Sequence, residues 1–119
     1  MCDFCDENII KNGLVYQTDN FYVRFDKYPV SVGHLLIISK RHIVSFSELN
    51  KIEKIEIWEV LEKAIYFLKT SQPNKPRDFN IGINEGRLAG RTIDHLHMHV
   101  IPRYEGDVED PEGGIRNII

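Results

Sequence analysis

The chain has 119 residues, a hydrophobic content of 42%, a charged content of 28% and a formal net charge of −3. A chain of this length forms one small domain with a single core, and we expect that domain to span residues 1–119. The acidic balance argues against binding to a nucleic acid polymer, and no apolar run is long enough for a transmembrane helix or a signal peptide. We therefore expect a cytoplasmic protein without membrane association.

The first third of the chain contains three strand patterns separated by turns. Residues 14–17 and 20–26 predict two strands joined by a turn, and the Tyr28-Pro29 step ends the second one. Residues 33–39 are almost continuously apolar, which is typical of a central strand buried on both faces. His34 lies in this run. We interpret it as a satisfied core histidine, with a place in a functional pocket as the alternative.

One long helix is predicted between residues 50 and 68. Asn50 is a favourable N-cap, and Glu53 three residues later completes a capping box. Apolar residues at helical spacing predict a buried stripe that packs into the core. The predicted stripe consists of Ile52, Ile55, Trp58, Leu61, Ile65 and Leu68.

The second half of the chain continues with strands. After a proline-containing loop at residues 71–78, residues 79–84 predict a strand, and a glycine-rich turn at residues 85–90 leads into the last one. One helix among closely connected strands favours an α+β fold with an antiparallel sheet. The apolar end at residues 117–119 either packs as a strand or stops short of the natural terminus.

Three of the five histidines alternate with apolar residues near the end of the chain: His95, His97 and His99. Alternate residues of a β-strand share one face, so this spacing predicts three imidazoles on one face of a strand that ends at Pro102. Three interpretations compete: a solvated polar face, a catalytic metal site, and covalent catalysis at phosphorus by an imidazole nucleophile. The neighbouring glycine-rich turn suits the third, because its backbone N–H groups can approach an anion closely.

Residues 90–103, with His-x-His-x-His among apolar residues, resemble the signature of the histidine triad (HIT) family. Residues 29–42 and the pair Cys2-x-x-Cys5 resemble the first half of that family, and residues 106–116 are similar to its diadenosine tetraphosphate hydrolase branch. The resemblance covers nearly the whole chain. It implies an α+β HIT-like fold, in which an antiparallel five-stranded sheet carries one long helix and a shorter helical segment, and it implies a homodimer.

The resemblance also assigns roles to individual positions. It implies that His97 attacks the α-phosphorus of a nucleotide, that His99 contacts the phosphate and the leaving group, and that His95 stands beside the nucleophile. The implied substrate-binding residues are Asp26 at the ribose, Asn84 and Thr92 at the phosphate, Arg91 at an outer phosphate, and Phe25 and Phe4 under the base. Many family members have glutamine at position 91. An arginine there favours a polyphosphate substrate, with a solvent-facing loop arginine as the alternative.

Cys2, Cys5, His42 and His95 match the zinc ligands of some HIT proteins and of the related galactose-1-phosphate uridylyltransferases. Two thiolates and two imidazoles form a closed tetrahedral set, so the resemblance implies a structural zinc that leaves no position for a catalytic water. Because the pair lies at the chain end, an N-terminus that frays is the alternative. No organic cofactor is expected.

Together these residues predict a nucleotide hydrolase or transferase that attacks the α-phosphate of a dinucleoside polyphosphate through a covalent nucleotidyl-histidine at His97. An adenosine 5'-phosphoramidase would use the same residues. Two alternatives come from other classes of protein: a nucleotide-binding regulator with weak catalysis, and a metallohydrolase with zinc on His95, His97 and His99. The expected ligand is a small-molecule nucleotide.

Overall fold

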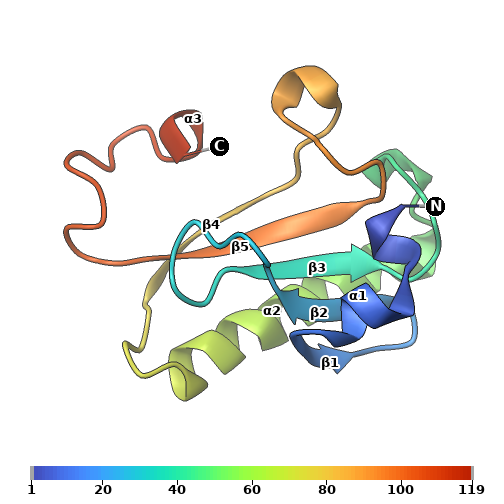
Figure 1. The fold of residues 1–119 in the computed structure, drawn as a ribbon, viewed down its shortest axis with the longest axis horizontal. Coiled ribbons are helices and arrows are strands. Elements are labelled where there is room, and N and C mark those ends of the chain that lie inside the picture. Colours follow the sequence, from blue (N-terminus) through green and yellow to red (C-terminus); the bar gives the residue numbers. More distant parts are fainter. Residues whose placement is uncertain (1, 119) are drawn as a thin grey trace.

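The computed structural model describes residues 2–118, which form a five-stranded antiparallel sheet with helices on both faces (Figure 1). The strands are β1 (Leu14–Gln17), β2 (Phe21–Phe25), β3 (Leu35–Ser39), β4 (Asp78–Gly82) and β5 (His97–Arg103), in the spatial order β1-β2-β3-β5-β4. The α-helices are α1 (Glu7–Lys11), α2 (Lys51–Ser71) and α3 (Ile115–Ile118), and the 3-10 turns are η1 (Asp3–Cys5), η2 (Phe46–Glu48) and η3 (Arg87–Ala89). The predicted α+β fold is confirmed.

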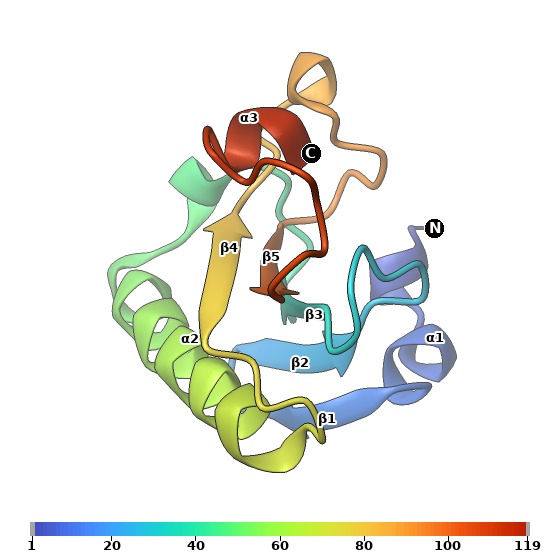
Figure 2. The same ribbon diagram turned by 90° about the vertical axis from the view of Figure 1, so that its left-hand side faces the viewer.

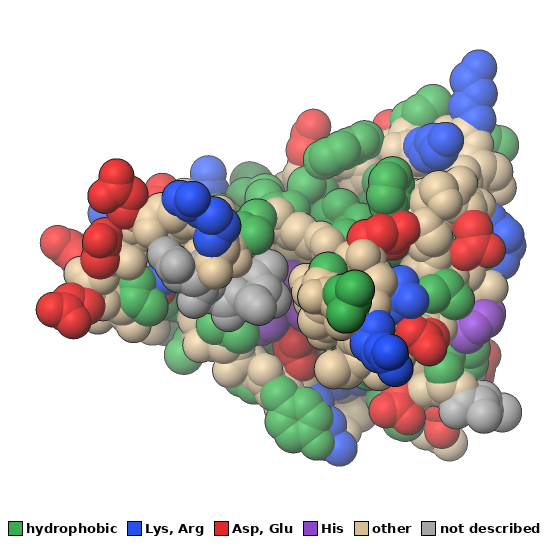
Figure 3. Space-filling model, turned by 90° about the horizontal axis from the view of Figure 1, so that it is seen from above, with side chains coloured by type: hydrophobic (Ala, Val, Ile, Leu, Met, Phe, Trp, Pro, Cys, Tyr) green, Lys and Arg blue, Asp and Glu red, His purple; other side chains and the backbone are tan. Residues whose placement is uncertain are grey.

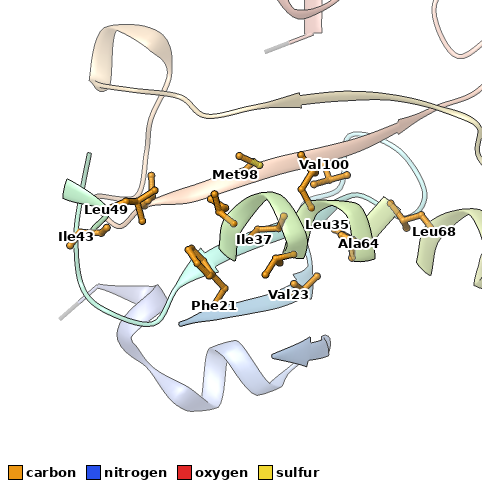
Figure 4. Close-up of a cluster of buried hydrophobic side chains, with 14 residues drawn as sticks. Phe21, Val23, Leu35, Ile37, Ile43, Leu49, Ala64, Leu68, Met98 and Val100 are labelled. Atoms are coloured by element: carbon orange, nitrogen blue, oxygen red, sulfur yellow. The ribbon is translucent and has the colours of Figure 1, made fainter. Parts of the chain in front are cut away.

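The sheet separates two clusters of buried hydrophobic side chains. Helix α2 covers one face, where it packs on β2, β3 and β5 (Figures 2 and 4). On the other face, Phe4 and Ile10 of the N-terminal segment pack on Leu36 and Ile38 of β3. Strand β3 is buried along its whole length between the two clusters, as the apolar run predicts. The N-terminal segment is thereby held against the same face of the sheet that carries the alternating histidines.

Helix α2 begins at the predicted capping box. The Glu53 backbone N–H donates to the Asn50 side chain, and the Asn50 backbone N–H donates to the Glu53 carboxylate, both at 2.9 Å. The helix continues three residues beyond the predicted end, to Ser71. Within residues 2–118, no helix is both long and apolar enough to cross a membrane.

The predicted buried stripe of α2 is wrong in its first half. Ile52, Ile55 and Trp58 are 70%, 59% and 61% exposed. The buried face consists instead of Glu53, Ile57, Val60, Leu61, Ala64 and Leu68. This part of the helix carries apolar residues on two faces, and the pairing of Glu53 with Arg41 at 2.9 Å compensates the charge that the chosen face buries. Packing on the sheet, not periodicity, therefore decides the rotation of α2.

The histidine-bearing strand begins later and ends later than predicted. Strand β5 starts at His97, so His95 precedes it and does not take part in its alternation. Pro102 lies inside β5, paired with Phe79 of β4. The pairing with β3 ends at Val100. Beyond that point the Ser31 hydroxyl donates to the Pro102 carbonyl in place of a neighbouring strand, and a residue without a backbone N–H is tolerated there.

The C-terminal segment returns to the sheet as α3. Residues 115–118 are helical, so the strand given as one alternative for residues 117–119 is wrong for residues 117–118, and residue 119 lies outside the described residues. A Cβ atom at Gly82 would lie 3.7 Å from Ile115 Cδ1, which places α3 against the end of β4 (Figure 2).

Candidate catalytic site

His95 is fully buried between the end of β3 and the N-terminal segment. Its Nε2 lies 2.6 Å from the carbonyl oxygen of Ser39. A carbonyl oxygen only accepts hydrogen bonds, so Nε2 carries the ring proton and Nδ1 keeps a free lone pair. Nδ1 is 3.2 Å from the Cys2 sulfur and 3.4 Å from the Cys5 sulfur. Burial lowers the pKa of His95, which favours the neutral ring.

Four ligand atoms converge at this point: Sγ of Cys2 and Cys5, and Nδ1 of His42 and His95. The six distances among them are all between 3.0 and 3.5 Å. The hydrogen bond with the Cys2 sulfur raises the pKa of the Cys5 thiol, whereas a cation at the centre would favour both thiolates. Two sulfurs and two ring nitrogens facing one another are the donor set of a structural zinc. The residues fit the predicted metal.

His97 is buried at the start of β5. Its Nδ1 lies 2.7 Å from the carbonyl oxygen of His95, so Nδ1 carries the proton and Nε2 holds the free lone pair. Burial lowers the pKa of His97 and thereby keeps the lone pair available near neutral pH. The Phe4 ring packs edge-on against the imidazole at a centroid distance of 5.0 Å. The arrangement fixes both the orientation and the tautomer of the ring.

His99 is oriented by a fourth histidine. The Val30 N–H donates to His34 Nδ1 at 3.0 Å, so His34 carries its proton on Nε2 and donates it to His99 Nδ1 at 2.9 Å. His99 must then carry its own proton on Nε2. The Asp26 carboxylate lies 3.4 Å from His34 Nε2. Burial lowers the pKa of His34, and it lowers the pKa of His99 to about 4. Both rings are therefore neutral near pH 7.

The contribution of His34 is the part of the site that the sequence alone does not reveal. His34 is buried and satisfied, as the core interpretation expects, but its partner is His99. The signal that points to this contact is the register of the sheet, in which Leu36 of β3 pairs with His99 of β5. That register places the residue before β3 near the end of the histidine row.

A cavity of about 230 Å³ opens over His97 and His99. It is lined by Phe4, Asp26, Tyr28, Leu36, Asn84, Gly90, Thr92, Ile93, His97 and His99. The structure thus brings the predicted ribose residue and both predicted phosphate residues together with the nucleophile. Seen from above, the imidazole surface in the middle of this face is recessed among other side chains (Figure 3). A larger hollow of about 860 Å³ beside the start of β4 contains no histidine and none of these residues.

Phe25 lies on the other side of the sheet. Its ring packs 6.1 Å from the ring of Phe67 in α2, and the side chain belongs to the cluster beneath that helix. The prediction that Phe25 lies under the base is therefore wrong. Successive side chains of a strand point to opposite faces, and the last residue of β2 points towards α2. Phe4, which lines the cavity, is the aromatic residue next to the nucleophile.

Arg91 forms an ion pair next to the cavity. Its Nε pairs with the carboxylate of Asp94 at 3.0 Å, and it is not among the residues that line the cavity, although Thr92 beside it is. Burial lowers the pKa of His97, and the positive charge of Arg91 acts in the same direction. The structure thus places a cation close to the site without giving it a direct position at the phosphate.

The geometry contradicts a metallohydrolase with zinc on His95, His97 and His99. The Nδ1 atoms of these residues face three different partners: the cysteines, a carbonyl oxygen and His34. Within residues 2–118, the side-chain groups close enough to share an ion are the Cys2, Cys5, His42, His95 cluster and the Asp26, His34, His99 cluster. In the second cluster, the hydrogen bond between the two imidazoles already satisfies the facing nitrogens.

The HIT domain model matches residues 7–106, so the chain belongs to the HIT domain family. AP-4-A phosphorylase of Mycobacterium tuberculosis is 36% identical over 87 residues, which are 72% of this chain and 44% of that protein. Adenosine 5'-monophosphoramidase HNT1 of Candida albicans is 32% identical over 108 residues, 86% of this chain and 70% of that protein. A zinc-bound histidine triad family protein from Mycobacterium smegmatis has a TM-score of 0.75 at 29% identity, covering 97% and 88% of the two chains. The predicted family and fold are confirmed.

Proposed function

We propose that this protein is a nucleotide hydrolase or transferase that attacks the α-phosphate of a dinucleoside polyphosphate through a covalent intermediate on His97. The observation that carries the proposal is the hydrogen bond from His97 Nδ1 to the His95 carbonyl, which leaves the Nε2 lone pair free in a ring that lines the cavity. A neutral imidazole with a fixed tautomer is the form that can act as a nucleophile.

The reaction has two steps. In the first, the His97 Nε2 lone pair forms an N–P bond while the P–O bond to the leaving nucleotide breaks and its electron pair passes to the departing oxygen. Asn84 and Thr92 hold phosphate oxygens, and the Asp26 carboxylate accepts hydrogen bonds from the ribose hydroxyls. In the second step water attacks phosphorus, the N–P bond breaks, its electron pair returns to Nε2, and the proton of the water passes to solvent. Inorganic phosphate in place of water would make the reaction a phosphorolysis, the activity named for the mycobacterial relative.

The state of His99 supports an anionic leaving group. Its Nδ1 accepts a hydrogen bond from His34, so it offers an Nε2–H to the departing oxygen. Its pKa of about 4 disfavours an imidazolium ion. A neutral N–H stabilises a phosphate oxygen that departs as an anion, whereas the nitrogen of a phosphoramidate needs a full proton. This favours a polyphosphate over a phosphoramidate as the substrate.

The covalent step is tested with wild type and His97→Gly. We expect hydrolysis of diadenosine tetraphosphate by the wild type and a protein adduct with the mass of one adenylyl group after rapid acid-free quenching. His97→Gly should lose turnover and regain part of it with added imidazole, which replaces the missing ring. Full turnover by His97→Gly without imidazole would refute the covalent mechanism.

The same assay separates the alternatives. An adenosine 5'-phosphoramidase would turn over adenosine phosphoramidate with a higher kcat/KM than diadenosine tetraphosphate. A nucleotide-binding regulator would bind both ligands and form no adduct. Any turnover of either ligand would be the same in the wild type and in His97→Gly. The first result would replace the polyphosphate substrate in the proposal, and the second would refute the proposed enzymatic activity.

We also propose that Cys2, Cys5, His42 and His95 hold a structural zinc. The ion would tie the N-terminal segment to the sheet, and it would fix the residue whose carbonyl oxygen orients His97. The mutual approach of the four ligand atoms supports the proposal, and the closed donor set leaves the ion no catalytic position.

A homodimer is the expected assembly. Strand β4 is an edge strand, and Ile52, Ile55 and Trp58 form an exposed apolar stripe on α2. A second copy of this chain would continue the sheet along the β4 edge and cover exposed apolar area. In a monomer, an unpaired strand edge and an exposed apolar stripe would both promote aggregation. Ile55→Asp should reduce the mass measured by light scattering to that of one chain. A dimer that survives this change would place the interface elsewhere.

A further inference from the structure

The cavity over His97 is too small for a whole dinucleotide. Its volume is about 230 Å³, whereas pockets that enclose drug-sized ligands usually measure roughly 300–1,000 Å³. The residues assigned to ribose, phosphate and nucleophile all line this one cavity, so the nucleotide that is attacked lies here. If the substrate is a dinucleoside polyphosphate, as proposed above, its second nucleoside must lie outside, against the rim.

Tyr28 is the aromatic side chain at that rim. It lines the cavity together with His97 and His99, yet 79% of its surface is exposed. Among the described residues, the other exposed aromatic side chains are Phe46, Trp58 and Tyr66, and none of them lines the cavity. A large exposed ring has no role in the core. Beside a nucleotide pocket it provides a flat apolar face on which a base can stack.

The backbone of Tyr28 is hydrogen-bonded to a residue of the site. Its backbone N–H donates to Asp26 Oδ1 at 2.9 Å, and the Asp26 backbone N–H donates to the His34 carbonyl at 2.9 Å. His34 in turn donates to His99. The loop between β2 and β3 lies on the side of the sheet that also carries α1, opposite α2 (Figure 2). The ring is therefore held on a loop tied to the histidine network.

Lys27 adds a positive charge to the same place. Its Nζ lies 5.8 Å from the centroid of the Tyr28 ring. The two residues together offer an ammonium group and an aromatic face, which are the two groups needed for the phosphates and the base of a nucleotide. We infer that Tyr28 stacks on the second nucleobase of a dinucleoside polyphosphate and that Lys27 contacts its outer phosphates. Tyr28 is then a specificity-determining residue, which distinguishes ligands with two nucleosides from ligands with one.

Equilibrium binding tests this inference independently of the chemistry. The probes are a methylene-bridged, non-hydrolysable analogue of diadenosine tetraphosphate, which has two bases, and AMP, which has one. The variants are Tyr28→Ala, Tyr28→Phe, which keeps the ring, and Tyr66→Ala, which removes an exposed tyrosine from α2. Because Tyr28 is so exposed, we expect all three variants to fold like the wild type, and their thermal unfolding midpoints check this.

We expect Tyr28→Ala to weaken binding of the analogue about tenfold and to leave AMP binding within about twofold. Tyr28→Phe and Tyr66→Ala should bind both probes like the wild type. Lys27→Met should weaken the analogue by about threefold at low salt and by less at high salt, because salt screens an exposed charge. In turnover assays, Tyr28→Ala should lower kcat/KM for diadenosine tetraphosphate and spare adenosine phosphoramidate.

Three results would overturn the inference: equal weakening of both probes by Tyr28→Ala, no effect on either probe, or a wild type that binds the analogue no more tightly than AMP. None of them bears on the covalent step, which is decided by turnover and adduct formation in His97→Gly. The two proposals can therefore fail separately.

Discussion

Acidification should destabilise this protein through His99. Burial lowers the pKa of His99 from its ordinary value of 6.5 to about 4 in the folded protein. Between these values the unfolded chain binds the proton and the folded protein does not, so stability is complete above about pH 6.5 and falls as the pH approaches 4. This pKa difference contributes at most about 3 kcal/mol to the free energy of unfolding. The whole contribution is lost below pH 4, and about 2 kcal/mol of it is already lost at pH 5.

The contribution of His99 is isolated by comparison with His99→Asn. Asparagine keeps an acceptor close to the position of Nδ1, so the hydrogen bond from His34 can persist, but it does not titrate. Urea unfolding followed by far-UV circular dichroism at pH 7 and pH 5 gives the free energy of unfolding for both proteins. Contributions of the metal ligands Cys2, Cys5 and His42 are common to the two proteins and cancel in the difference.

We expect the wild type to lose about 2 kcal/mol more than His99→Asn between pH 7 and pH 5. Equal losses in the two proteins would mean that His99 is not held neutral in the folded state. The argument that the leaving group departs as an anion would fail with it.

Three further predictions concern the surroundings of the site. His34→Asn should lower kcat about 100-fold with little change in KM, because His99 loses the donor that orients it, and a KM effect alone would contradict this role. Cys5→Ser should reduce bound zinc from about one ion per chain to near zero by metal analysis, and unchanged zinc content would exclude Cys5 as a ligand. Gly33→Ala should lower the free energy of unfolding by about 1–3 kcal/mol in urea titrations, because φ is +93° there and the new Cβ would lie 3.3 Å from Leu68; an unchanged stability would refute the strain.

Local chemistry made much of the fold predictable. The capping box at Asn50 depends on residues three positions apart, so the sequence contains the complete signal, and helix α2 begins where that signal places it. The apolar run before Lys40 is buried on both faces in the structure, as its composition indicates. The two strands before it lie within one residue of the predicted ranges.

Much of the candidate site was also present in the sequence, once the resemblance to the HIT family assigned roles. Asp26, Asn84 and Thr92 line the same cavity as His97, although they come from different parts of the chain. These positions follow from motifs with fixed spacing. Phe25 was misplaced because the direction of the last side chain of a strand depends on register and on what packs against it.

The sequence by itself determined the strands β1 to β3, the start of the long helix, the cysteine pair and the row of imidazoles, because each depends on residues close together in the chain. Only the tertiary structure decided which stripe of α2 is buried, that Phe25 packs beneath α2, and that His34 orients His99. The reason is physical. Periodicity indicates that a helix has an apolar face. Packing between segments far apart in the chain decides the rotation of the helix and the hydrogen-bond partner of an imidazole ring.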